Sequence, residues 1–332
     1  MHIDPGPIMR LSTAYWESQV LLTANRIGVF EAVKLGPLSV ESIAEKLKTQ
    51  VEPTRLFLNA CVALGLLERA NDGYKNSPMS QVFLVAGTPA YMGNAIRYSD
   101  NLYATWGQLE HALHSGLPPM APETYLGRDS EKTRHFVYGM HNRALGIGRM
   151  LLDLVDLTGR TQMLDIGGGP GTYSALFVQR YPQLRSRVLD LPDVVNVARE
   201  IVSSMGVNDR IDFIPGDYGQ TAYPQNNDVV LISGVFHREN PQDCQNLIAR
   251  ARDALAPGGL LVLSDVFTDA GGIGPTFATL FGVNMMLTAS HGGVHADQDV
   301  ASWLANAGFI DISTKQFAPP MPHRVVAGVK RK

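Results

Sequence analysis

The sequence contains a glycine-rich stretch, "MLDIGGGPGTYSALF" at residues 163–177, in which an apolar segment leads into four glycines and then into a helix-like pattern. Glycine tolerates positive φ angles, and because it has no Cβ its backbone can lie against a ligand at van der Waals distance. The same stretch could also be a tight strand-to-helix turn without a ligand. The spacing of the glycines and the residues that follow them have to distinguish the two.

The spacing of these glycines does not fit a dinucleotide-binding loop. Such a loop has the order Gly-x-Gly-x-x-Gly, whose last glycine or alanine packs the helix against the strand. Counting from Gly167 and Gly169, the sixth position is Thr172. The observed order, Gly167-x-Gly169-x-Gly171, is the one expected for S-adenosylmethionine, which has no pyrophosphate to place at a helix N-terminus.

Acidic residues follow the next two predicted strands. Asp190 ends the strand in "RVLDLPDVV", and Asp217 and Tyr218 follow the next strand in "GDY". A carboxylate can accept hydrogen bonds from both ribose hydroxyls or from an adenine amino group, and a tyrosine ring can lie against the adenine. Each acid alone would be an ordinary loop residue, but three successive strand ends carrying Gly, Asp and Asp together predict a nucleoside site.

Strands that alternate with helices from residue 162 onward must position these residues. The strand-like segments are "QMLDIGG", "RSRVLDL", "RIDFIPGD", "DVVLISGV" and "GGLLVLSDV", separated by helix-like segments such as "SALFVQRY" and "CQNLIARARDAL". This alternation predicts an α/β fold with a doubly wound parallel sheet, in which ligands bind at the carboxyl ends of the strands. Residues 95–160 are predicted to be mainly helical, with a Pro-rich loop at residues 115–127.

The N-terminal part has the pattern of a winged helix. A helix is predicted over residues 12–34, ending before Gly36 and Pro37; two helix-like segments, "LSVESIAEKLK" and "VEPTRLFLNACVALGLLER", then precede a hairpin at "ANDGYKNSPMS". Residues 38–76 hold five basic and five acidic residues, and the third helix is mostly apolar, which suits burial against protein better than DNA. A ligand-responsive transcription factor is the alternative from a different class. We expect no regular structure in the first eight residues.

The composition is that of a globular protein, with 45% apolar and 18% charged residues among 332. The net charge is −3 and the sequence has no run of like charges, so it offers no basic segment that would bind nucleic acid or an anionic membrane. Cys61 and Cys244 cannot form a disulfide framework, the N-terminus lacks a signal-peptide pattern, and no apolar run reaches the length of a membrane span. We expect a cytoplasmic protein whose partners are small molecules or protein.

The chain resembles the class I S-adenosylmethionine-dependent O-methyltransferases of the small-molecule type, found in plant phenolic metabolism and bacterial natural-product pathways. The resemblance covers nearly the whole chain and rests on "LDIGGGPGT", "LDLPDVV", "GDY", "ALAPGGLLVLSD" and "AGF". It implies a winged-helix-like dimerisation domain, placed at residues 1–95, and a catalytic domain with leading linker helices at residues 96–332. It also implies a homodimer, which would cover the apolar N-terminal helices.

The resemblance implies S-adenosylmethionine as the cofactor and S-adenosylhomocysteine as the product. The implied cofactor-binding residues are Gly167, Gly169, Asp190, Leu191, Asp217, Tyr218 and Ser233. Methyl transfer is an in-line displacement, so the enzyme must place the acceptor hydroxyl and remove its proton. The residues that remove the proton should therefore lie at the same edge of the sheet as the cofactor.

Under this resemblance His237 is the general base. It lies just past the fourth strand, where family members carry a histidine that is commonly followed by Asp-Trp; here Arg238 and Glu239 follow. A neutral imidazole suits this task because its pKa lies near working pH. Asp265, in "VLSD", lies where plant members carry a glutamate, and a carboxylate there would orient the imidazole.

The third catalytic position departs from the family pattern. The family segment "GG.ER" is "GGVHA" here, so His295 stands where plant members have a second glutamate, and Ala296 replaces the arginine. This leaves open a different grip on the substrate, or a family member that keeps the cofactor but catalyses decarboxylation, hydroxylation or a pericyclic rearrangement. His291 and His295, with His237 and Asp265, could also ligate a metal ion, but the Gly-Gly between the first two opposes a shared helical face, and we predict no metal site.

The walls of the acceptor site are expected from the helices before the glycine loop and from "FGVNMML". The candidates are Trp106, Phe136, Met140, Asn284 and Met285, of which Met140 resembles a family position near the transferred methyl group. Each of them alone could equally be a core residue. Together they predict a small, apolar and aromatic acceptor that is methylated on a hydroxyl.

Overall fold

The computed structural model describes residues 3–120, 130–319 and 321–332. The chain divides into two compact units, Met1–Tyr103 and Ala104–Lys332, so this boundary lies inside the helix α7 (Gly93–Trp106), at residue 103, whereas the sequence placed it at residue 95. Part of the expected Pro-rich loop, residues 121–127, lies outside the described residues. Within the described part of the chain, no helix has both the length and the apolar character needed to span a membrane.

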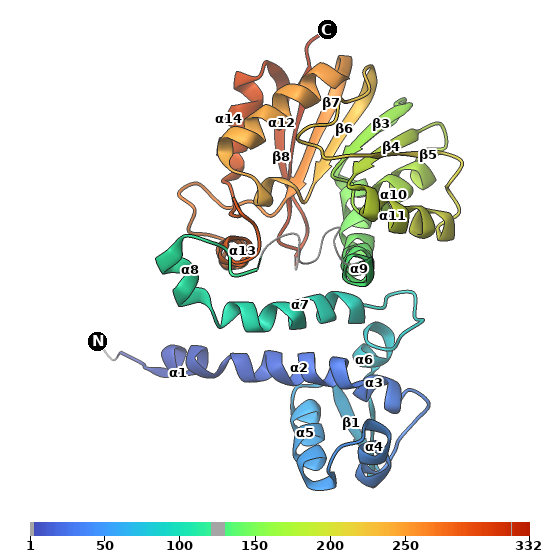
Figure 1. Ribbon diagram of the computed structural model, residues 1–332, viewed down its shortest axis with the longest axis vertical. Helices are drawn as coiled ribbons and strands as arrows, with labels where there is room; N and C mark the ends of the chain where they lie inside the picture. The colour runs from blue at the N-terminus through green and yellow to red at the C-terminus, as the bar shows by residue number, and fades with distance from the viewer. Residues whose placement is uncertain (1–2, 121–129, 320) are drawn as a thin grey trace. The chain divides into compact units, whose positions relative to one another are not determined.

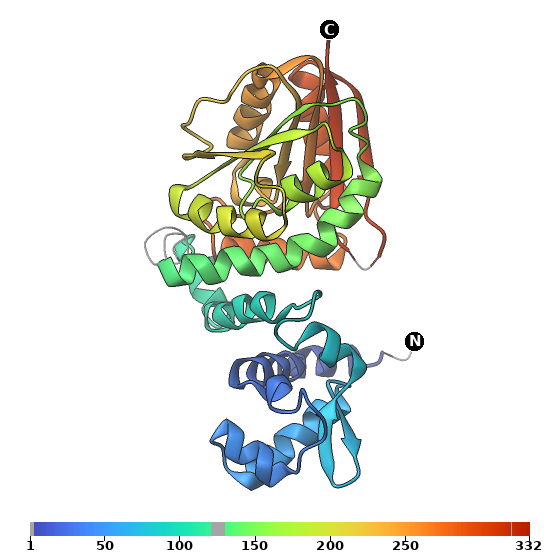
Figure 2. The ribbon, with the colours of Figure 1, turned by 90° about the vertical axis from the view of Figure 1, so that its right-hand side faces the viewer.

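The N-terminal unit consists of short helices and one hairpin (Figure 2). Its elements are α1 (Gly6–Thr13), α2 (Tyr15–Ile27), α3 (Val29–Ala32), α4 (Val40–Leu47), α5 (Val51–Ala63), β1 (Leu67–Ala70), β2 (Gly73–Asn76), α6 (Pro78–Phe83) and the start of α7. The side chain of Ser39 caps α4 by accepting the N–H of Ser42, and β1 pairs with β2 in antiparallel register. The succession of α4, α5 and the hairpin is the predicted winged-helix pattern.

Two details of this unit differ from the sequence-based expectation. The helix expected over residues 12–34 is divided, because Gly28 adopts a left-handed conformation with φ +82° and ends α2. In addition, α1 begins at Gly6, inside the segment expected to lack regular structure, and the Asp4 carboxylate accepts the N–H of Gly6 at 2.9 Å. The turn-forming residues therefore precede and open a helix instead of forming an irregular arm.

The C-terminal unit is built on a seven-stranded sheet with the strand order β5-β4-β3-β6-β7-β9-β8. The strands are β3 (Gln162–Ile166), β4 (Arg185–Asp190), β5 (Ile211–Pro215), β6 (Asn227–Ser233), β7 (Leu255–Asp265), β8 (Phe309–Gln316) and β9 (Arg324–Lys330). The first five are parallel, but β9 runs antiparallel to both β7 and β8, so the sheet is mixed and differs from the expected parallel sheet at this edge. The short connection from β8 to β9 explains the difference, because a parallel pair needs a crossover of a dozen or more residues.

Helices cover both faces of this sheet (Figure 1). The helices of this unit are α8 (Leu109–Ser115), α9 (Ser130–Leu154), α10 (Thr172–Arg180), α11 (Pro192–Ser204), α12 (Pro241–Ala254), α13 (Thr276–Met286) and α14 (Asp297–Asn306), with a short 3-10 helix η2 (Phe236–Arg238). Neighbouring residues of one strand point to opposite faces: Leu164 packs in the cluster with α12 and α14, whereas Met163 packs in the cluster with α9 and α10. Both faces of β3 are therefore buried.

The strand order places a switch point between β3 and β6. The chain leaves β3 towards β4 and β5 on one side, and later returns to β6 and β7 on the other. In doubly wound sheets this reversal opens a crevice at the carboxyl ends of the two central strands. The glycine loop follows β3 and His237 follows β6, so the fold brings the expected cofactor and base positions to the same edge.

Candidate active site

The glycine loop leaves β3 through three residues in the left-handed conformation. The φ angles are +65° for Gly167, +53° for Gly169 and +70° for Gly171, and other residues adopt such angles only with strain. A Cβ on Gly167 would also lie 2.6 Å from Cγ2 of Val235 and 3.6 Å from Cδ1 of Tyr218. The loop therefore presents bare backbone, enclosed by side chains, at the switch point.

Asp190, the last residue of β4, is tied to this loop. Its Oδ2 accepts the N–H of Gly169 at 2.7 Å, and its Oδ1 accepts the N–H of Leu191 at 2.8 Å. Burial raises the pKa of this carboxyl, against the lowering effect of the two N–H groups. A carboxylate oxygen accepts more than one hydrogen bond, so both oxygens keep capacity for ribose hydroxyls.

The other residues expected to contact the cofactor lie after β5 and at the end of β6. Asp217 is exposed and its Oδ1 accepts the N–H of Gly219 at 2.7 Å, whereas the ring of Tyr218 lies beside Gly167. The Tyr218 hydroxyl donates to Oε1 of Glu239 at 2.5 Å, and burial together with the charge of Glu239 raises its pKa, so it remains a donor. Ser233 ends β6 and is half-buried. A left-handed glycine loop with acceptors and an aromatic ring around it fits an adenosyl group.

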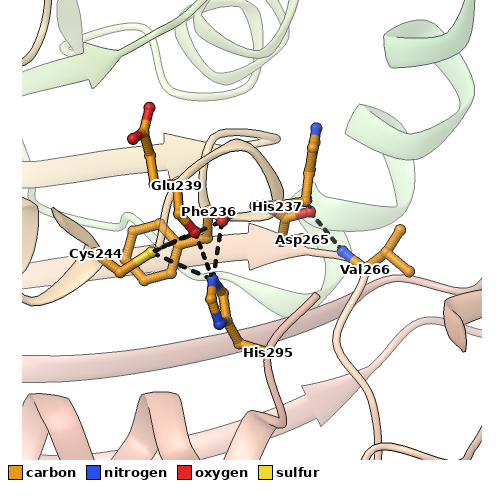
Figure 3. A network of polar contacts seen from close by, with 7 residues as sticks. All are labelled: Phe236, His237, Glu239, Cys244, Asp265, Val266 and His295. Atoms are coloured by element: carbon orange, nitrogen blue, oxygen red, sulfur yellow. Dashed lines mark hydrogen bonds and ion pairs between the residues drawn. The ribbon is translucent and has the colours of Figure 1, made fainter. Parts of the chain in front are cut away.

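His237 and Asp265 form a hydrogen-bonded pair at the ends of β6 and β7 (Figure 3). Nδ1 of His237 lies 2.7 Å from Oδ1 of Asp265, and the Asp265 carboxylate also accepts the N–H groups of Val266 at 2.7 Å and of His237 at 3.3 Å. Because an ionised carboxylate only accepts, the proton of the neutral imidazole sits on Nδ1, and Nε2 is free to take a proton.

The electrostatics of the pair keep Asp265 ionised. Burial acts to raise the pKa of this carboxyl, but the charge and hydrogen bond of His237 and the N–H of Val266 outweigh it, and the pKa is lowered. The Asp265 side chain is 4% exposed and that of His237 is 15% exposed. The carboxylate is thus enclosed while the imidazole retains an open side.

The helix α13 places an aromatic ring against His237. The ring of Phe281 meets the His237 ring edge to face, with 4.9 Å between centroids. Asn284 and Met285 follow three and four residues later, on the same side of the helix; Met285 is buried, and Nε1 of Trp106 donates to Oδ1 of Asn284 at 2.9 Å. The helix α13 therefore links Trp106, through Asn284, to His237, through Phe281.

The helix α9 carries the remaining candidates for the acceptor wall. Phe136 packs against a buried cluster with Val137 of α9 and Val194 of α11, so it contributes to the core of this unit. Met140 is half-buried on the same helix. The next residue, His141, lies with Nδ1 2.8 Å from Oγ1 of Thr172, the first residue of α10, and burial lowers its pKa. This link beside the glycine loop was not expected from the sequence, because no local motif marks it.

His295 lies against the backbone of the turn that carries His237. Its Nε2 is 3.1 Å from the carbonyl oxygen of Phe236 and 3.0 Å from that of Glu239. The family position led us to expect a catalytic role for His295, but its Nε2 is already hydrogen-bonded to two main-chain carbonyl groups. His291 is exposed, and among the described residues no group of three His, Cys, Asp or Glu side chains is arranged to hold a metal ion.

Sequence reasoning missed Glu239, Phe281 and His323 as residues around His237. His323 precedes β9; its buried Nδ1 has no hydrogen-bond partner, and burial lowers its pKa to about 4, against the opposing charge of Asp265. Phe281 and His323 reach the site from segments far from His237 in the sequence, whereas Glu239 lies on the same turn as His237. No short sequence pattern predicts that Phe281 and His323 lie near His237.

Two family models match the chain. One describes an O-methyltransferase domain and covers residues 107–310, and the other describes an O-methyltransferase dimerisation domain and covers residues 9–86. The chain belongs to the S-adenosylmethionine-dependent O-methyltransferases. The resemblance stated from the sequence motifs is therefore confirmed, and so are the α/β class of the fold and the cofactor.

Similar proteins span nearly the whole O-methyltransferase. A 3-hydroxy-5-methyl-1-naphthoate 3-O-methyltransferase of Streptomyces sahachiroi is 30% identical over 330 residues, covering 98% of this chain and 95% of that protein. Acetylserotonin O-methyltransferase of Mus musculus is 30% identical over 326 residues, with 92% and 84% covered. The crystal structure of human N-acetylserotonin methyltransferase in complex with SAM is 25% identical, covers 98% of this chain and 97% of that one, and superposes with a TM-score of 0.88.

These relatives decide between the alternatives left open by the sequence. The winged-helix pattern belongs to a dimerisation domain of methyltransferases, which removes the argument for a transcription factor. The relatives are named methyltransferases, so the enzyme is an O-methyltransferase acting on small molecules, in spite of the departure at His295 and Ala296.

Proposed function

We propose that this O-methyltransferase methylates a hydroxyl of a small aromatic molecule and that His237 is its general base. The observation that carries the proposal is the 2.7 Å contact between Nδ1 of His237 and Oδ1 of Asp265, which in the neutral imidazole places the proton on Nδ1 and leaves Nε2 as the acceptor. The ring of Phe281 against His237, and the Trp106 ring bonded to Asn284 on the same helix as Phe281, support an aromatic acceptor. Two relatives are named for a hydroxynaphthoate and for acetylserotonin, which are both aromatic.

In this mechanism each residue has a separate task. Nε2 of His237 takes the proton of the acceptor hydroxyl, and the Asp265 carboxylate holds Nδ1–H and stabilises the imidazolium that results. The backbone of residues 167–171 and the carboxylate of Asp190 hold the adenosyl group, with Tyr218 beside it. When bound, S-adenosylmethionine supplies the electrophilic methyl group.

The proposal is tested by assaying the purified enzyme with labelled S-adenosylmethionine and matched acceptors. We expect methyl transfer to naphthols or other phenols and none to the anilines of the same shape. One relative, of Streptomyces rimosus, is named an N,N-dimethyltransferase, so the assay has to include the anilines for comparison. Methylation of the amines alone would contradict the proposed acceptor class.

The role of His237 is tested with His237→Ala. Loss of a general base lowers turnover by about 10²-fold or more. Affinity for S-adenosylmethionine, measured by calorimetry, should stay within a few-fold, because His237 is not among the residues expected to contact the cofactor, which lie at the ends of β3, β4, β5 and β6. Turnover equal to that of the unmodified enzyme would remove His237 from the mechanism.

We also propose that the enzyme is a homodimer formed through the N-terminal unit. The dimerisation domain is present, and α1 and α2 expose large apolar side chains, namely Ile8, Met9, Leu11, Tyr15 and Trp16. An exposed apolar surface of this kind marks an interaction site. Light scattering should give twice the chain mass, and the double variant Leu11→Glu, Trp16→Glu should be monomeric, whereas Leu35→Glu, at an exposed position outside these helices, should stay dimeric.

A further inference from the structure

The proposed base, His237, lies on a short turn between β6 and α12. Residues outside this turn form hydrogen bonds to its backbone. The 3-10 helix η2 covers Phe236–Arg238, and Asn240 caps α12 by accepting the N–H of Asp243 with its side chain. The carbonyl oxygen of His237 accepts the N–H of Gly293 at 3.0 Å. The carbonyl oxygens on either side of His237, those of Phe236 and Glu239, both meet Nε2 of His295, at 3.1 Å and 3.0 Å.

The chemistry of these contacts fixes the state of the His295 ring. Carbonyl oxygens only accept, so Nε2 must carry the proton and share its single N–H between the two carbonyls. A second donor lies beside it: Sγ of the buried Cys244 is 3.5 Å from Nε2 and 3.7 Å from the Phe236 oxygen. Burial raises the pKa of Cys244, so this thiol keeps its proton. The Phe236 oxygen also accepts the N–H of Glu239 at 3.1 Å within the turn, whereas the Glu239 oxygen is met by Nε2 of His295 and, at 3.8 Å, by Sγ of Cys244.

His295 is itself anchored to the strand that carries Asp265. Its carbonyl oxygen accepts the N–H of Thr268 at 2.9 Å, and Thr268 and Ala296 form an isolated parallel bridge. Thr268 lies three residues past Asp265, the last residue of β7. The edge of the Trp303 ring, 5.2 Å away between centroids, restricts the His295 ring further. His295 therefore connects the end of β7 with the turn that follows β6.

We propose that His295 is a positioning residue, whose Nε2–H holds the turn so that His237 meets Asp265, and that it transfers no proton itself. In Figure 3 the His295 ring approaches the two carbonyls from one side, and the side chain of His237 points away from it. The inference rests on the proposed role of His237 as base. It also explains why a histidine can stand where the family pattern has a glutamate: here the contact is to the main chain of the turn, and needs a donor.

The same turn also contacts the cofactor site through Glu239. An effect on the base can nevertheless be distinguished from an effect on cofactor binding. The Glu239 carboxylate accepts from the Tyr218 hydroxyl, but the Tyr218 carbonyl oxygen is held independently by Nη1 of Arg250 at 2.6 Å and by the hydroxyl of Tyr223 at 2.7 Å. Releasing the turn should therefore disturb the base more than the adenosyl contacts. We expect turnover to fall while the dissociation constant of S-adenosylmethionine stays within a few-fold.

The experiment compares His295→Leu, which removes the donor, with His295→Gln, whose side-chain amide can donate from a similar place. A matched control is His291→Leu, which removes the exposed imidazole four residues earlier in the same segment. We expect kcat of His295→Leu to fall by about 10-fold to 100-fold, the scale of a misplaced reacting group. His295→Gln should recover to within a few-fold of the unmodified enzyme, and His291→Leu should not change.

A spectroscopic measurement provides a readout that needs no substrate. The Nδ1–H proton of His237, identified by its absence in His237→Ala, should give a downfield resonance in the unmodified enzyme and in His295→Gln. It should broaden or disappear in His295→Leu, because the contact with Asp265 is then loosened. If the unmodified enzyme methylates no acceptor, the proposed function fails, and this signal still tests His295.

Three outcomes would overturn the inference. A folded His295→Leu enzyme with kcat within two-fold of the unmodified one would show that the turn holds itself. An enzyme in which His295→Gln is as impaired as His295→Leu would indicate direct proton transfer by the imidazole. If His295→Leu does not fold, His295→Asn replaces it: its shorter side chain withdraws the donor, and activity equal to that of His295→Gln would likewise contradict a positioning role.

Discussion

Nδ1 of His237 lies 2.7 Å from Oδ1 of Asp265, and the two residues come from the ends of adjacent parallel strands. The register of β6 and β7 pairs Ser233 with Ser264, so Asp265 comes one residue after this pair, whereas His237 lies four residues past Ser233 on the turn. Asp265 accepts from the backbone at both oxygens, which leaves it in one orientation. The sheet therefore fixes the carboxylate, and the turn after β6 has to deliver the imidazole.

Replacing Asp265 by asparagine should disable the base without removing it. The amide can donate to Nδ1 and would then favour the tautomer with the proton on Nε2, which cannot accept a proton from the acceptor. We expect kcat to fall by about 10²-fold or more, with about 10⁴-fold as the upper scale known for such a change in a catalytic triad. Steady-state kinetics measure the loss.

The control for this change is Asp253→Asn, at an exposed ion pair with Arg252 at the end of α12, which should leave kcat unchanged. Binding of S-adenosylmethionine should be similar in all three proteins. An Asp265→Asn enzyme that keeps more than a third of its turnover would mean that His237 is oriented by other contacts.

Gly167→Ala should weaken the binding of S-adenosylmethionine. The substitution places a Cβ at φ +65° and 2.6 Å from Cγ2 of Val235, so the loop has to move away from its present course. Gly159→Ala is the matched control, because Gly159 has φ +78° with no atom within 4 Å of the added Cβ. Calorimetry should show at least a ten-fold loss of affinity in the first variant only. Equal affinities would mean that the cofactor does not depend on this backbone.

The cofactor side of the site could be predicted from the sequence because its signals are local. A glycine triplet of fixed spacing and an acid at the end of the next strand are both read along one short segment, and the alternation of strands and helices brings those segments to one edge. The structure places Gly167, Asp190 and Tyr218 together. The individual cofactor contacts stay predictions, since they await a measurement.

The acceptor side could not be predicted to the same depth. The contacts of His295 are to carbonyl oxygens, which every residue has, so no side-chain pattern signals them. Phe281 and His323 approach the base from α13 and from the connection before β9, and only tertiary packing decides their neighbours. The antiparallel edge formed by β8 and β9 was missed for a similar reason, because the connection there has no helix to mark it.

Trp106→Phe should alter the recognition of the acceptor and leave the chemistry nearly intact. The indole N–H donates to Oδ1 of Asn284 at 2.9 Å, which turns the amide N–H₂ of Asn284 to the other side. Without this bond the amide is free to rotate, at a cost of about 1 kcal/mol, or roughly a five-fold rise in the KM of the acceptor. Steady-state kinetics with one acceptor test this.

The matched variant for this bond is Asn284→Leu, which removes the amide altogether. If Trp106 acts only by orienting Asn284, adding Trp106→Phe to Asn284→Leu should cause little further change in KM. Additive losses would show that the indole contacts the acceptor independently.

The buried Asp165 should make the stability of the enzyme depend on pH with an unusual sign. This residue of β3 is fully buried, its Oδ2 accepts from the Ser174 hydroxyl at 2.7 Å, and its Oδ1 has no partner. Burial raises its pKa to about 7. The folded state therefore keeps a proton that the unfolded chain loses near pH 4, and the free energy of unfolding falls as pH rises between these values, by up to about 1.4 kcal/mol per unit.

Asp165→Asn tests this dependence because it removes the titration with little change in shape. Urea unfolding of both proteins at several pH values between 5 and 8 should show the unmodified enzyme losing stability relative to the variant as pH rises, with the difference levelling above about pH 7. Asp265, whose pKa is lowered, acts with the opposite sign, since its contribution is present above its unfolded value and is lost as pH falls through the folded one. Its titration lies below this range, so it cannot mask the effect. Parallel curves for the two proteins would show that Asp165 is ionised in the fold and that its unpartnered oxygen is stabilised by groups not yet identified.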